Sequence, residues 1–255
     1  MLEVKNLTYR VGSREILDGV SLTARDGEIT LLVGNNGSGK TTLLRAVTAY
    51  HENRAHISGN ISIDGESAAL LTPRIIASRI ALMPQTLPIP KMTVRELVAL
   101  GRSADRSPFS RETEEDRKAI EEAIAALELS DFADTPLAHL SGGERQSAYL
   151  SLLLAKGAKN LILDEPASAL DSKNRRRLFS FLREMRDEGR TVLTVLHDLT
   201  EASELADRIV VLDKRRVAFD GAPSELRKSD IPEVLFGLQA VTTVRDGKEV
   251  TVYLP

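Results

Sequence analysis

A nine-residue turn rich in glycine limits the folds open to this chain more than any other segment. The turn, GNNGSGKTT at 34–42, lies between the apolar run ITLLV and the segment TLLRAVTAY, a pattern typical of a strand, a loop and a helix. Glycines allow successive backbone N–H groups to point inwards around an anion, and the helix start adds partial positive charge. Lys40 could reach the β- and γ-phosphates of a nucleotide, and the Thr41 hydroxyl could ligate Mg²⁺. We therefore expect a nucleoside triphosphate site formed by Gly34, Asn35, Asn36, Gly37, Ser38, Gly39, Lys40, Thr41 and Thr42.

Two acidic residues follow another apolar run, LIL at 161–163. Mg²⁺ prefers hard oxygen ligands, and one hydroxyl with two phosphate oxygens leaves positions of its octahedral shell to fill. Asp164 ends an expected buried strand and is the candidate to bind Mg²⁺ either directly or through another ligand, because ligands of open α/β sheets collect at that edge. Glu165 is one residue further and is placed to polarise an attacking water as a general base. Two acids can simply end a strand, but the phosphate-binding turn favours the functional interpretation.

Three other residues end expected strands and are candidates for the same crevice. His197 ends TVLH and could hydrogen-bond the γ-phosphate or the water, and Gln85 ends ALMPQ and could hold a water near Mg²⁺. Tyr9 ends NLTY, where an aromatic ring could stack on a base. Each also has a plain structural interpretation, as a satisfied histidine, an incidental amide or a rim residue. The convergence of several strand ends on one turn favours the functional interpretation.

The remaining pattern indicates an α/β fold with two additions. Residues 2–33 mostly alternate apolar and polar residues, which favours antiparallel strands before the glycine-rich turn. From about 140 onwards expected helices alternate with apolar strands, so we expect parallel β-α-β units in a twisted sheet. The stretch between, from about 90 to 140, is predicted to be a helical insertion. The expected elements include helices at 93–102, 111–130 (with an apolar stripe of Ile120, Ile124 and Leu127), 143–157 and 171–189, a short strand closed by an Asp64-Gly65 turn, and a hairpin at 208–221 turned at Asp213-Lys214.

Composition excludes several classes of function. The formal net charge is −3, which argues against a basic groove for nucleic acid. The absence of cysteine excludes disulfides, thiolate metal sites and a cysteine nucleophile. No apolar run approaches the ~20 residues of a membrane span, and the N-terminus has no signal-peptide core. We therefore expect the chain to stay on the cytoplasmic side of any membrane that it serves.

The motifs GNNGSGKTT, LSGGERQ, LILDEP, SALD and TVLHD occur in this order, and over almost its whole length the chain resembles the ATP-binding subunits of ABC transporters. The resemblance implies ATP as the nucleotide and Mg²⁺ as its cation. The implied site residues are the Walker A loop Gly34–Thr42, the Q-loop residue Gln85, the signature Leu140–Glu144, Walker B Leu161–Asp164, the catalytic base Glu165, the D-loop residue Asp171, the switch histidine His197 and the adenine-stacking aromatic Tyr9. Lys40, Gln85, Glu165 and His197 are expected to act in catalysis, and Thr41, Gln85 and Asp164 at Mg²⁺.

The resemblance also implies a role for LSGGERQ. Ser141, Gly142, Gly143 and Glu144 begin an expected helix and would form a second anion-binding cap. ABC ATP-binding subunits dimerise head to tail, so this cap is expected to contact the γ-phosphate held by the phosphate loop of the other copy. Two ATP molecules would then lie between the two subunits of a homodimer, and hydrolysis would remove the phosphate that bridges them.

The implied organisation is an α/β P-loop NTPase core with a mixed central sheet, an N-terminal antiparallel β subdomain and an inserted α-helical subdomain. We expect an ABC ATP-binding domain over 1–220, with the helical subdomain inserted at about 86–157, and a C-terminal tail, 221–255, packed on the same domain. The implied partners are a second ATP-binding subunit, two integral membrane permease subunits and, indirectly, an external solute-binding protein, with no nucleic acid. The implied location is peripheral, on the cytoplasmic face of the inner membrane.

The segment MPQTLPIPKMTVRELVALGRS and the C-terminal residues are similar to those of Fe³⁺-siderophore, haem and cobalamin importers. We expect such an importer, with residues 86–110 receiving the permease, and charge reversal at Arg95 or Glu96 weakening assembly. Importers of another metal or small solute stay open. A soluble ABC ATPase acting on DNA or ribosomes would carry two ATP-binding units or a long coiled coil, and neither pattern is present. Glu165 argues against a regulator without turnover.

Overall fold

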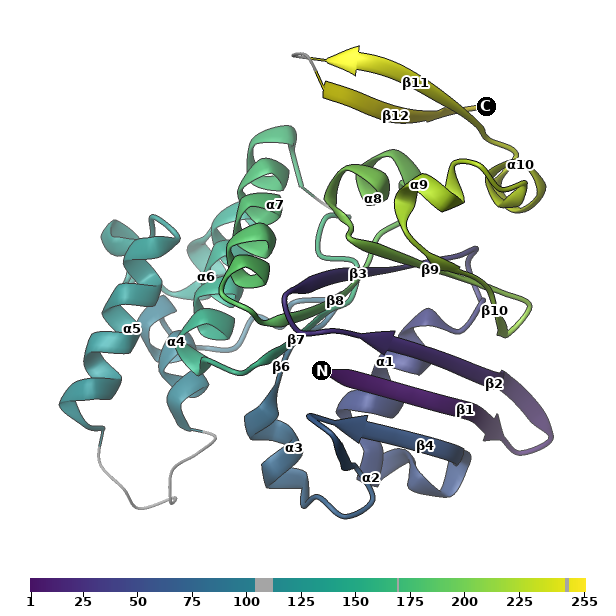
Figure 1. The fold of residues 1–255 in the computed structure, drawn as a ribbon. Coiled ribbons are helices and arrows are strands. Elements are labelled where there is room, and N and C mark those ends of the chain that lie inside the picture. The colour runs from purple at the N-terminus through teal and green to yellow at the C-terminus, as the bar shows by residue number, and fades with distance from the viewer. Residues whose placement is uncertain (104–111, 169, 246–247) are drawn as a thin grey trace.

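The structure is a computed structural model that describes residues 1–103, 112–168, 170–245 and 248–255. It has a six-stranded central sheet, a four-stranded antiparallel sheet and a C-terminal two-stranded hairpin (Figure 1). The antiparallel N-terminal sheet and the mixed central sheet with its helices confirm the predicted fold class. Among the described residues, no helix combines the length and the apolar character that crossing a bilayer requires.

The central sheet has the strand order β10-β9-β3-β8-β7-β6. Neighbouring strands from β9 to β6 are parallel, whereas β10 is antiparallel to β9. The sheet is mixed because helices connect its parallel strands and a hairpin turn adds the edge strand β10. Its strands are β3 (Glu28–Val33), β6 (Ile80–Met83), β7 (Asn160–Leu163), β8 (Thr191–Val195), β9 (Arg208–Asp213) and β10 (Arg216–Gly221).

Both faces of the central sheet are covered, and each face has its own hydrophobic core. Alternation along β3 directs Leu31 to one face, where helices α4 to α8 pack, and Leu32 to the other. On the second face α1 (Lys40–Thr48) packs together with residues of the antiparallel sheet. Burial on both sides explains why the central strands are almost continuously apolar.

The antiparallel sheet has the order β2-β1-β4-β5. Its inward residues on β1, such as Leu2, Val4 and Leu7, are at most 2% exposed and alternate with polar residues. Asp64 and Gly65, both with positive φ, connect β4 to β5 as the sequence predicted. The strands are β1 (Leu2–Val11), β2 (Arg14–Ala24), β4 (Ile57–Ile63) and β5 (Glu66–Ser67).

Among the described residues, α4, α5 and α6 form the predicted helical region, which packs on the face of the central sheet away from the antiparallel sheet. The predicted apolar stripe of α5, Ile120, Ile124 and Leu127, is buried. Residues 104–111, between α4 and α5, lie outside the described residues. The helices before the C-terminal tail are α2 (Tyr50–Asn53), α3 (Pro73–Arg79), α4 (Val94–Ser103), α5 (Glu114–Ala126), α6 (Gly142–Lys156), α7 (Ser172–Asp187) and α8 (Leu199–Leu205), with 3₁₀ turns at 54–56, 130–132 and 137–139.

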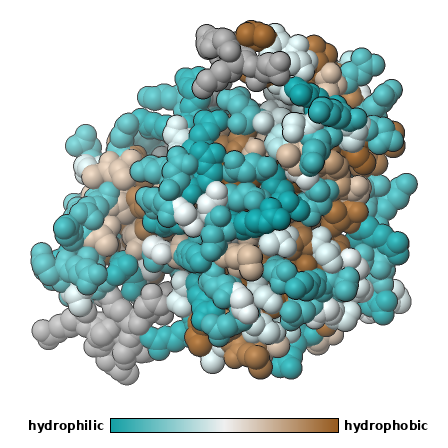
Figure 2. Space-filling view, viewed as in Figure 1, coloured by the Kyte–Doolittle hydropathy of each residue, from teal (hydrophilic) through white to brown (hydrophobic). Residues whose placement is uncertain are grey.

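The C-terminal residues form two short helices and a hairpin that packs on α8 through Tyr253. Val241, Val244 and Leu254 of the hairpin are exposed, and Figure 2 shows brown surface at the top of the molecule, where Figure 1 places the hairpin. These elements are α9 (Pro223–Leu226), α10 (Ile231–Phe236), β11 (Gln239–Arg245) and β12 (Lys248–Leu254).

One predicted turn is displaced by a residue. The hairpin of β9 and β10 was expected to turn at Asp213-Lys214, but Asp213 pairs with Arg216 and the turn is formed by Lys214 and Arg215. Both turn residues have positive φ, 43° and 75°. The pairing of β10 with β9 therefore decides the turn position, and it moves Arg215 to the tip of the hairpin.

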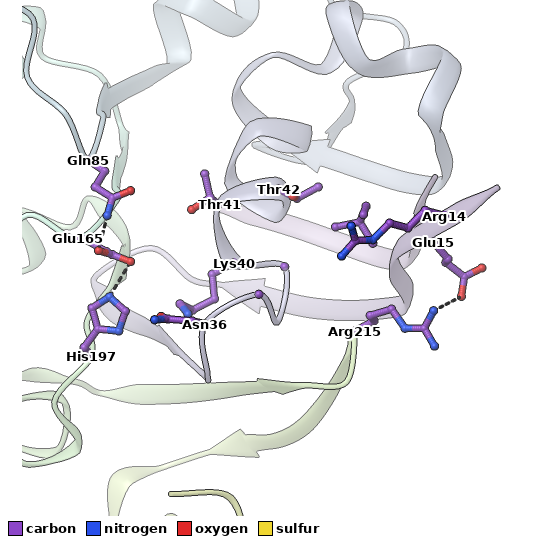
Figure 3. A pocket seen from close by; sticks show the side chains of 13 residues that line it. Arg14, Glu15, Asn36, Lys40, Thr41, Thr42, Gln85, Glu165, His197 and Arg215 are labelled. Atoms are coloured by element: carbon purple, nitrogen blue, oxygen red, sulfur yellow. Dashed lines mark hydrogen bonds and ion pairs between the residues drawn. The ribbon is translucent and has the colours of Figure 1, made fainter. Parts of the chain in front are cut away.

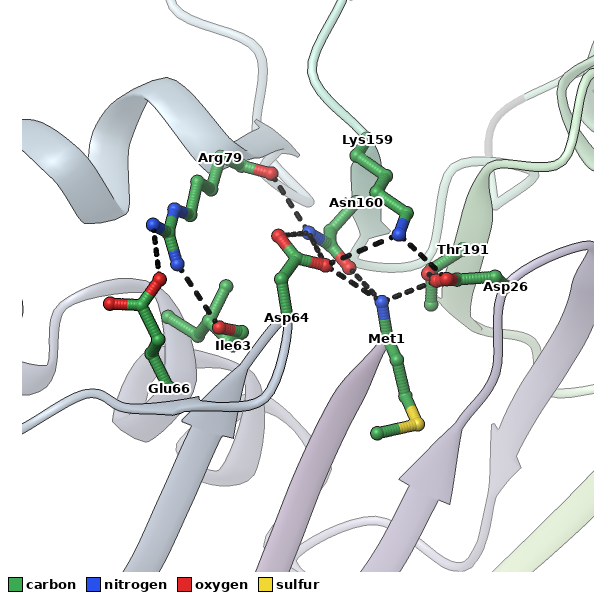
Figure 4. A network of polar contacts seen from close by, with 9 residues as sticks. All are labelled: Met1, Asp26, Ile63, Asp64, Glu66, Arg79, Lys159, Asn160 and Thr191. Atoms are coloured by element: carbon green, nitrogen blue, oxygen red, sulfur yellow. Dashed lines mark hydrogen bonds and ion pairs between the residues drawn. The ribbon is translucent and has the colours of Figure 1, made fainter.

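A polar cluster joins the two sheets at the amino-terminal edge of the central sheet (Figure 4). The Asn160 side-chain amide donates to the Asp64 carboxylate at 3.1 Å, and the α-amine of Met1 donates to Asp64 at 2.9 Å. Lys159 forms an ion pair with Asp26 at 2.6 Å. Burial raises the pKa of Asp26, but hydrogen bonds from Lys159 and the α-amine outweigh burial and hold that pKa well below its usual range. This cluster fixes the sheets at the edge opposite the glycine-rich turn.

Candidate nucleotide-binding site

The glycine-rich turn opens onto a cavity of about 1040 Å³ at the carboxyl ends of the central strands. The cavity brings together residues that are far apart in the sequence, as Figure 3 shows. Phosphate-loop residues lie in its middle, and strand-end residues form one side. Its lining comprises Arg14, Glu15, Ile16, Asn36, Gly37, Gly39, Lys40, Thr41, Thr42, Gln85, Glu165, His197 and Arg215.

Close packing dictates the glycines of the loop. A Cβ atom at Gly34 would lie 2.2 Å from the Leu212 carbonyl oxygen of β9, and one at Gly39 would lie 2.5 Å from the Leu17 side chain of β2. Both glycines also have positive φ, 152° and 107°, which other residues adopt only with strain. The loop is therefore held between β9 and β2 in a conformation that side chains would prevent.

Lys40 fills the centre of the loop. Its Nζ donates to the carbonyl oxygens of Gly34 at 2.7 Å and Asn35 at 3.2 Å, and the residue is only 6% exposed. Burial lowers the pKa of Lys40, and the charges of Glu165 and Asp164 oppose that shift. An ammonium group that is desolvated in this way gains strongly from a negatively charged ligand. The geometry can therefore hold a phosphate chain against Lys40.

Asp164 lies beneath the cavity at the end of β7 and is 6% exposed. Its carboxylate accepts a hydrogen bond from the Thr41 hydroxyl, but its Oδ1 atom is buried without a partner. Burial raises the pKa of Asp164. An unsatisfied carboxylate oxygen beside a hydroxyl fits a hard cation such as Mg²⁺. Because the described residues contain no cluster of three or more His, Asp or Glu able to hold a metal, such a cation would also need oxygen ligands from a bound phosphate.

Glu165 is held between two neighbouring strand ends. The Gln85 side-chain amide donates to one carboxylate oxygen at 2.6 Å, and Nε2 of His197 lies 2.6 Å from the other. Gln85 follows β6, Glu165 follows β7 and His197 follows β8, so the three predicted strand ends do meet (Figure 3). Glu165 also has φ 50°, a strained value for a residue with a side chain. The structure thus holds a carboxylate rigidly at the edge of the phosphate loop.

Tyr9 does not reach the cavity, so its predicted place at the base is wrong. It is only 9% exposed and belongs to the core between the antiparallel sheet and α1. Its hydroxyl donates to the Asn53 side chain at 2.6 Å, and its ring lies 5.6 Å from the ring of His56. The prediction used the position of Tyr9 near a strand end, whereas the face of the strand decides where the ring points.

Four lining residues were missed by the sequence analysis: Arg14, Glu15, Ile16 and Arg215. The first three belong to β2, which runs beside the phosphate loop, and Arg215 is at the tip of the hairpin of β9 and β10. No local motif marks these residues. Their position depends on the packing of β2 and of that hairpin around the loop.

The second glycine-containing turn starts α6 but does not line the cavity. Ser141 caps the helix: its hydroxyl accepts from the Glu144 N–H at 3.3 Å, and the Glu144 carboxylate accepts from the Ser141 N–H at 2.8 Å. These hydrogen bonds lower the pKa of Glu144. The carboxylate of Glu144 therefore caps the helix, and the contact of Glu144 with a nucleotide held by another copy stays a prediction. The N–H groups of Gly142 and Gly143 start the helix beside it.

Asp171 caps α7 by accepting from the Asn174 N–H at 2.8 Å. The Asn174 side chain also packs on the second turn, because a Cβ atom at Gly143 would lie 2.3 Å from its Nδ2 atom. The predicted D-loop SALD spans 168–171, and its second residue lies outside the described part of the chain. The start of α7 and the start of α6 therefore form one contiguous surface.

Known proteins are similar to this chain in sequence and in fold. A family model described as ABC transporter matches residues 17–168, more than half of the chain. The chain is 33% identical to the iron(3+)-hydroxamate import ATP-binding protein FhuC of Bacillus subtilis (strain 168), over 98% of this chain and 93% of that protein. It is 36% identical to the hemin import ATP-binding protein HmuV of Rhodococcus jostii (strain RHA1), over 92% of this chain and 80% of that protein.

The fold agrees with this similarity. A solved structure of a metal-chelate type ABC transporter in an inward-facing conformation matches with a TM-score of 0.85 and 25% identity, over 100% of this chain and 96% of that one. The similarity therefore extends over both sheets, the helical region and the C-terminal residues. From the matched family model, the nearly full-length relatives and the shared fold, we conclude that the chain belongs to the ABC transporter family, as one of its ATPases.

Proposed function

We propose that this chain is the ATP-binding and ATP-hydrolysing subunit of an ABC importer. The observation that carries the proposal is the meeting of Lys40, Gln85, Glu165 and His197 at one cavity beside the phosphate loop. Membership of the ABC transporter family and similarity to import ATP-binding proteins over almost the whole chain support it.

Binding of ATP begins at the phosphate loop. Lys40 donates to two carbonyl oxygens of its own loop, and its third N–H can reach a ligand. The proposed ligand is the β/γ-phosphate segment of ATP, which offers negative charge to a buried ammonium. The loop N–H groups and the start of α1 add donors and partial positive charge, since no side chain caps α1.

Hydrolysis then uses the strand-end residues. Glu165 is proposed to accept a proton from the attacking water, whose oxygen forms a bond to the γ-phosphorus while the bond to the ADP oxygen breaks. His197 and Gln85 already hold the two carboxylate oxygens of Glu165 in place. His197 is 46% exposed and could donate to the γ-phosphate from the same position.

Mg²⁺ is the cation that best suits the donors on this chain. We propose that Thr41 and the unpaired oxygen of Asp164 hold it, with Gln85 beside a water in its shell. Mg²⁺ would neutralise charge on the phosphates of bound ATP. The fit rests on the buried Oδ1 atom, which otherwise has no partner.

The proposed active form is a head-to-tail homodimer. Ser141, Gly142 and Gly143 do not line the cavity of their own chain, so they can contact a nucleotide only if that nucleotide is held by another copy. The start of α6, a helix of 15 residues, carries the partial positive charge that suits a γ-phosphate. ATP would thus join two copies, and hydrolysis would release them.

The proposed cargo is a Fe³⁺-siderophore, haem or cobalamin. The relatives named for iron-hydroxamate import and hemin import support the first two. In this proposal the dimer is peripheral on the cytoplasmic face of the inner membrane, bound to two integral membrane permease subunits that receive solute from an external binding protein. An importer of another metal or small solute is the alternative. A soluble ABC ATPase outside transport is less favoured, because the chain has no basic surplus for nucleic acid.

We propose residues 1–220 as the ATP-binding domain, with the helical subdomain at about 86–157 and the tail 221–255 packed on it. Contacts of the tail with Thr200 and with the phosphate loop support this division. The permease is proposed to bind at 86–103, where Ile89 and Leu100 are 51% and 49% exposed. The rest of the predicted segment, 104–110, lies outside the described residues.

Arg95 and Glu96 are poor probes of this permease surface. Arg95 forms ion pairs with Glu121 and Asp134, and Glu96 accepts from the Thr93 N–H at 2.8 Å. Charge reversal at either position would therefore disturb the helical region itself. Substitution of Ile89 by aspartate removes no internal polar contact and tests the surface more directly.

The test of the proposed function is reconstitution. The purified chain should hydrolyse ATP in the presence of Mg²⁺, and candidate permease in lipid vesicles should stimulate hydrolysis further when its solute-loaded binding protein is supplied. Ile89→Asp should abolish the stimulation and leave hydrolysis by the isolated chain unchanged. Absence of any ATP hydrolysis by chain and permease together would contradict the proposal.

A further inference from the structure

The end of the cavity away from Glu165 is lined by charged residues. Arg14, Glu15, Ile16 and Arg215 form this end, and none of the thirteen residues that line the cavity is phenylalanine, tyrosine or tryptophan. Figure 3 shows Arg14 and Arg215 on the far side of the phosphate loop from Gln85 and His197. A nucleotide with its γ-phosphate at Glu165 and its phosphate chain on Lys40 must place its base toward this end.

A β-bulge directs β2 into the cavity. Tyr9 pairs with Leu17 and Arg10 pairs with Glu15, so Ile16 is an extra residue in β2. Bulges bend a strand and re-aim its side chains, and they are common next to active sites. The carbonyl oxygen of Ile16 lies 3.1 Å from the position of a Cβ at Gly39. Because β2 touches the phosphate loop at Ile16, its next residues outward, Glu15 and Arg14, lie just beyond the phosphates.

The two arginines differ in how they are held. Arg215 forms an ion pair with Glu15 at 4.0 Å, and its backbone carbonyl accepts from the Asp18 N–H at 3.0 Å. Glu15 is itself fixed by two hydrogen bonds from Arg10, at 2.8 and 2.9 Å. In Figure 3 Arg215 turns toward Glu15, whereas Arg14 extends toward the phosphate loop.

The Arg14 guanidinium has no hydrogen bond or ion pair to any other residue that the structure describes. A planar cation without a partner, at the mouth of a cavity for an anionic ligand, is suited to stack on a flat π-system, because guanidinium is weakly hydrated and binds aromatic faces. Arg14 therefore lies where the base is expected, and its guanidinium is not engaged by another described residue.

We propose that Arg14 binds the nucleobase by stacking, in the place that Tyr9 cannot reach. This inference rests on the ATP-binding function proposed above and assigns the residue that recognises the base. Stacking of an arginine on a base combines surface contact with attraction between the cation and the ring. Arg215 is turned toward Glu15, with which it forms an ion pair, and takes no part in the proposed stacking.

The test compares ATP with a ligand that has no base. Binding of ATP and of inorganic tripolyphosphate to the full-length chain is measured by titration calorimetry without Mg²⁺, so that nothing is hydrolysed. Arg14→Ala should weaken ATP binding about fivefold to tenfold and change tripolyphosphate binding by less than about twofold. Arg14→Tyr should restore ATP binding because it keeps a stacking surface, and Arg14→Lys should not because it keeps only the charge. Arg215→Ala removes the same charge at the same end and should change ATP binding by less than about twofold.

Two outcomes would overturn the assignment. Equal losses for ATP and tripolyphosphate in Arg14→Ala would make Arg14 a phosphate-binding charge, and unchanged ATP affinity would remove it from the site. Failure of the unsubstituted chain to bind either ligand would instead contradict the proposed function. Tripolyphosphate binding by the unsubstituted chain thus separates failure of the phosphate site from failure of the base contact.

Discussion

The two glycine-containing turns both start helices, but those helices are capped in different ways. At the phosphate loop, Gly39 caps α1 without a side chain, and the first turn of α1 contains no acidic residue. At the second turn, Ser141 caps α6 and Glu144 returns a hydrogen bond from its carboxylate. The first helix start therefore has no capping side chain, whereas the second has a carboxylate on the Ser141 N–H and leaves the N–H groups of Gly142 and Gly143 without a side-chain cap.

The two turns also differ in the contacts that a side chain would make in place of glycine. Gly34 is required by its own chain, because a Cβ would overlap the Leu212 carbonyl oxygen. Gly142 has nothing within 4 Å of a Cβ position and does not have positive φ. No contact among the described residues requires a glycine at 142, so this position leaves room for the close approach of another molecule. Gly143 is instead constrained by its own chain, because a Cβ there would lie 2.3 Å from Nδ2 of Asn174.

Glu165→Gln should produce the largest effect, because it keeps both turns and removes the base between them. The rate of ATP hydrolysis should fall by a factor of about 10² to 10⁴, the usual contribution of a general base. ATP should still bind, and size-exclusion chromatography with ATP should show a doubled mass. Glu184→Gln, on the outer surface of α7, is the matched control and should behave as the unsubstituted chain. A monomer with full turnover would refute the role of Glu165.

Lys40→Ala tests the first turn alone. Loss of a buried charged donor should weaken ATP binding by about 100-fold. The measurement is titration calorimetry, with Lys173→Ala, in the first turn of α7 and outside the cavity lining, as the control that should bind ATP with unchanged affinity. Affinity close to that of the unsubstituted chain would mean that the phosphate loop does not hold the nucleotide.

Whether a feature of the site could be predicted from the sequence depends on how local that feature is. Lys40 and Thr41 were predictable because strand, turn and helix are contiguous and their motif has few other uses. Glu165 and His197 were predictable because parallel strands end at one edge of a sheet, whichever their order. These predictions required the direction of each strand and nothing about its pairing.

The failures depend on pairing between distant segments. Tyr9 turns into the core because of its register with β2, and the bulge at Ile16 that brings Arg14 to the cavity is a property of the same pairing. Arg215 reaches the cavity because β10 extends the central sheet beside β2, almost 200 residues away in the chain. The direction of the Glu144 side chain depends on its capping bond to Ser141, which the motif alone does not reveal. Strand register and helix capping decide where a side chain points, and a sequence motif alone does not reveal either.

Gly34→Ala and Gly142→Ala each add one methyl group, and their effects on stability compare the two turns. The first should lower the free energy of unfolding by about 3 kcal/mol, because the methyl group overlaps a backbone carbonyl and φ is positive. The second should change that free energy by less than about 1 kcal/mol and in the stabilising direction, because alanine is the better helix former. Urea denaturation of both variants measures the difference. Equal destabilisation would show that both glycines serve the fold of their own chain.

The interaction of Glu144 with Ser141 should give the smallest effect and is best detected through its dependence on pH. The folded-state pKa of Glu144 lies below its ordinary value of 4.5, so its carboxylate stabilises the folded chain fully above about pH 4.5. That stabilisation is lost as the pH falls through the folded-state pKa. Because Glu144 is only partly buried, screening by solvent limits the contribution to less than about 1 kcal/mol.

Glu144→Gln keeps an oxygen acceptor for the Ser141 N–H and removes the charge. The melting temperature of this variant should therefore lie below that of the unsubstituted chain at neutral pH, and the two should converge as the pH falls through the lowered folded-state pKa of Glu144. All other carboxylates titrate in both proteins and cancel in the difference. A difference that grows as the pH falls would show that the carboxylate does not stabilise this helix start. If the two proteins also dimerise equally with ATP, the second turn binds the partner's nucleotide through its N–H groups and hydroxyl rather than through Glu144.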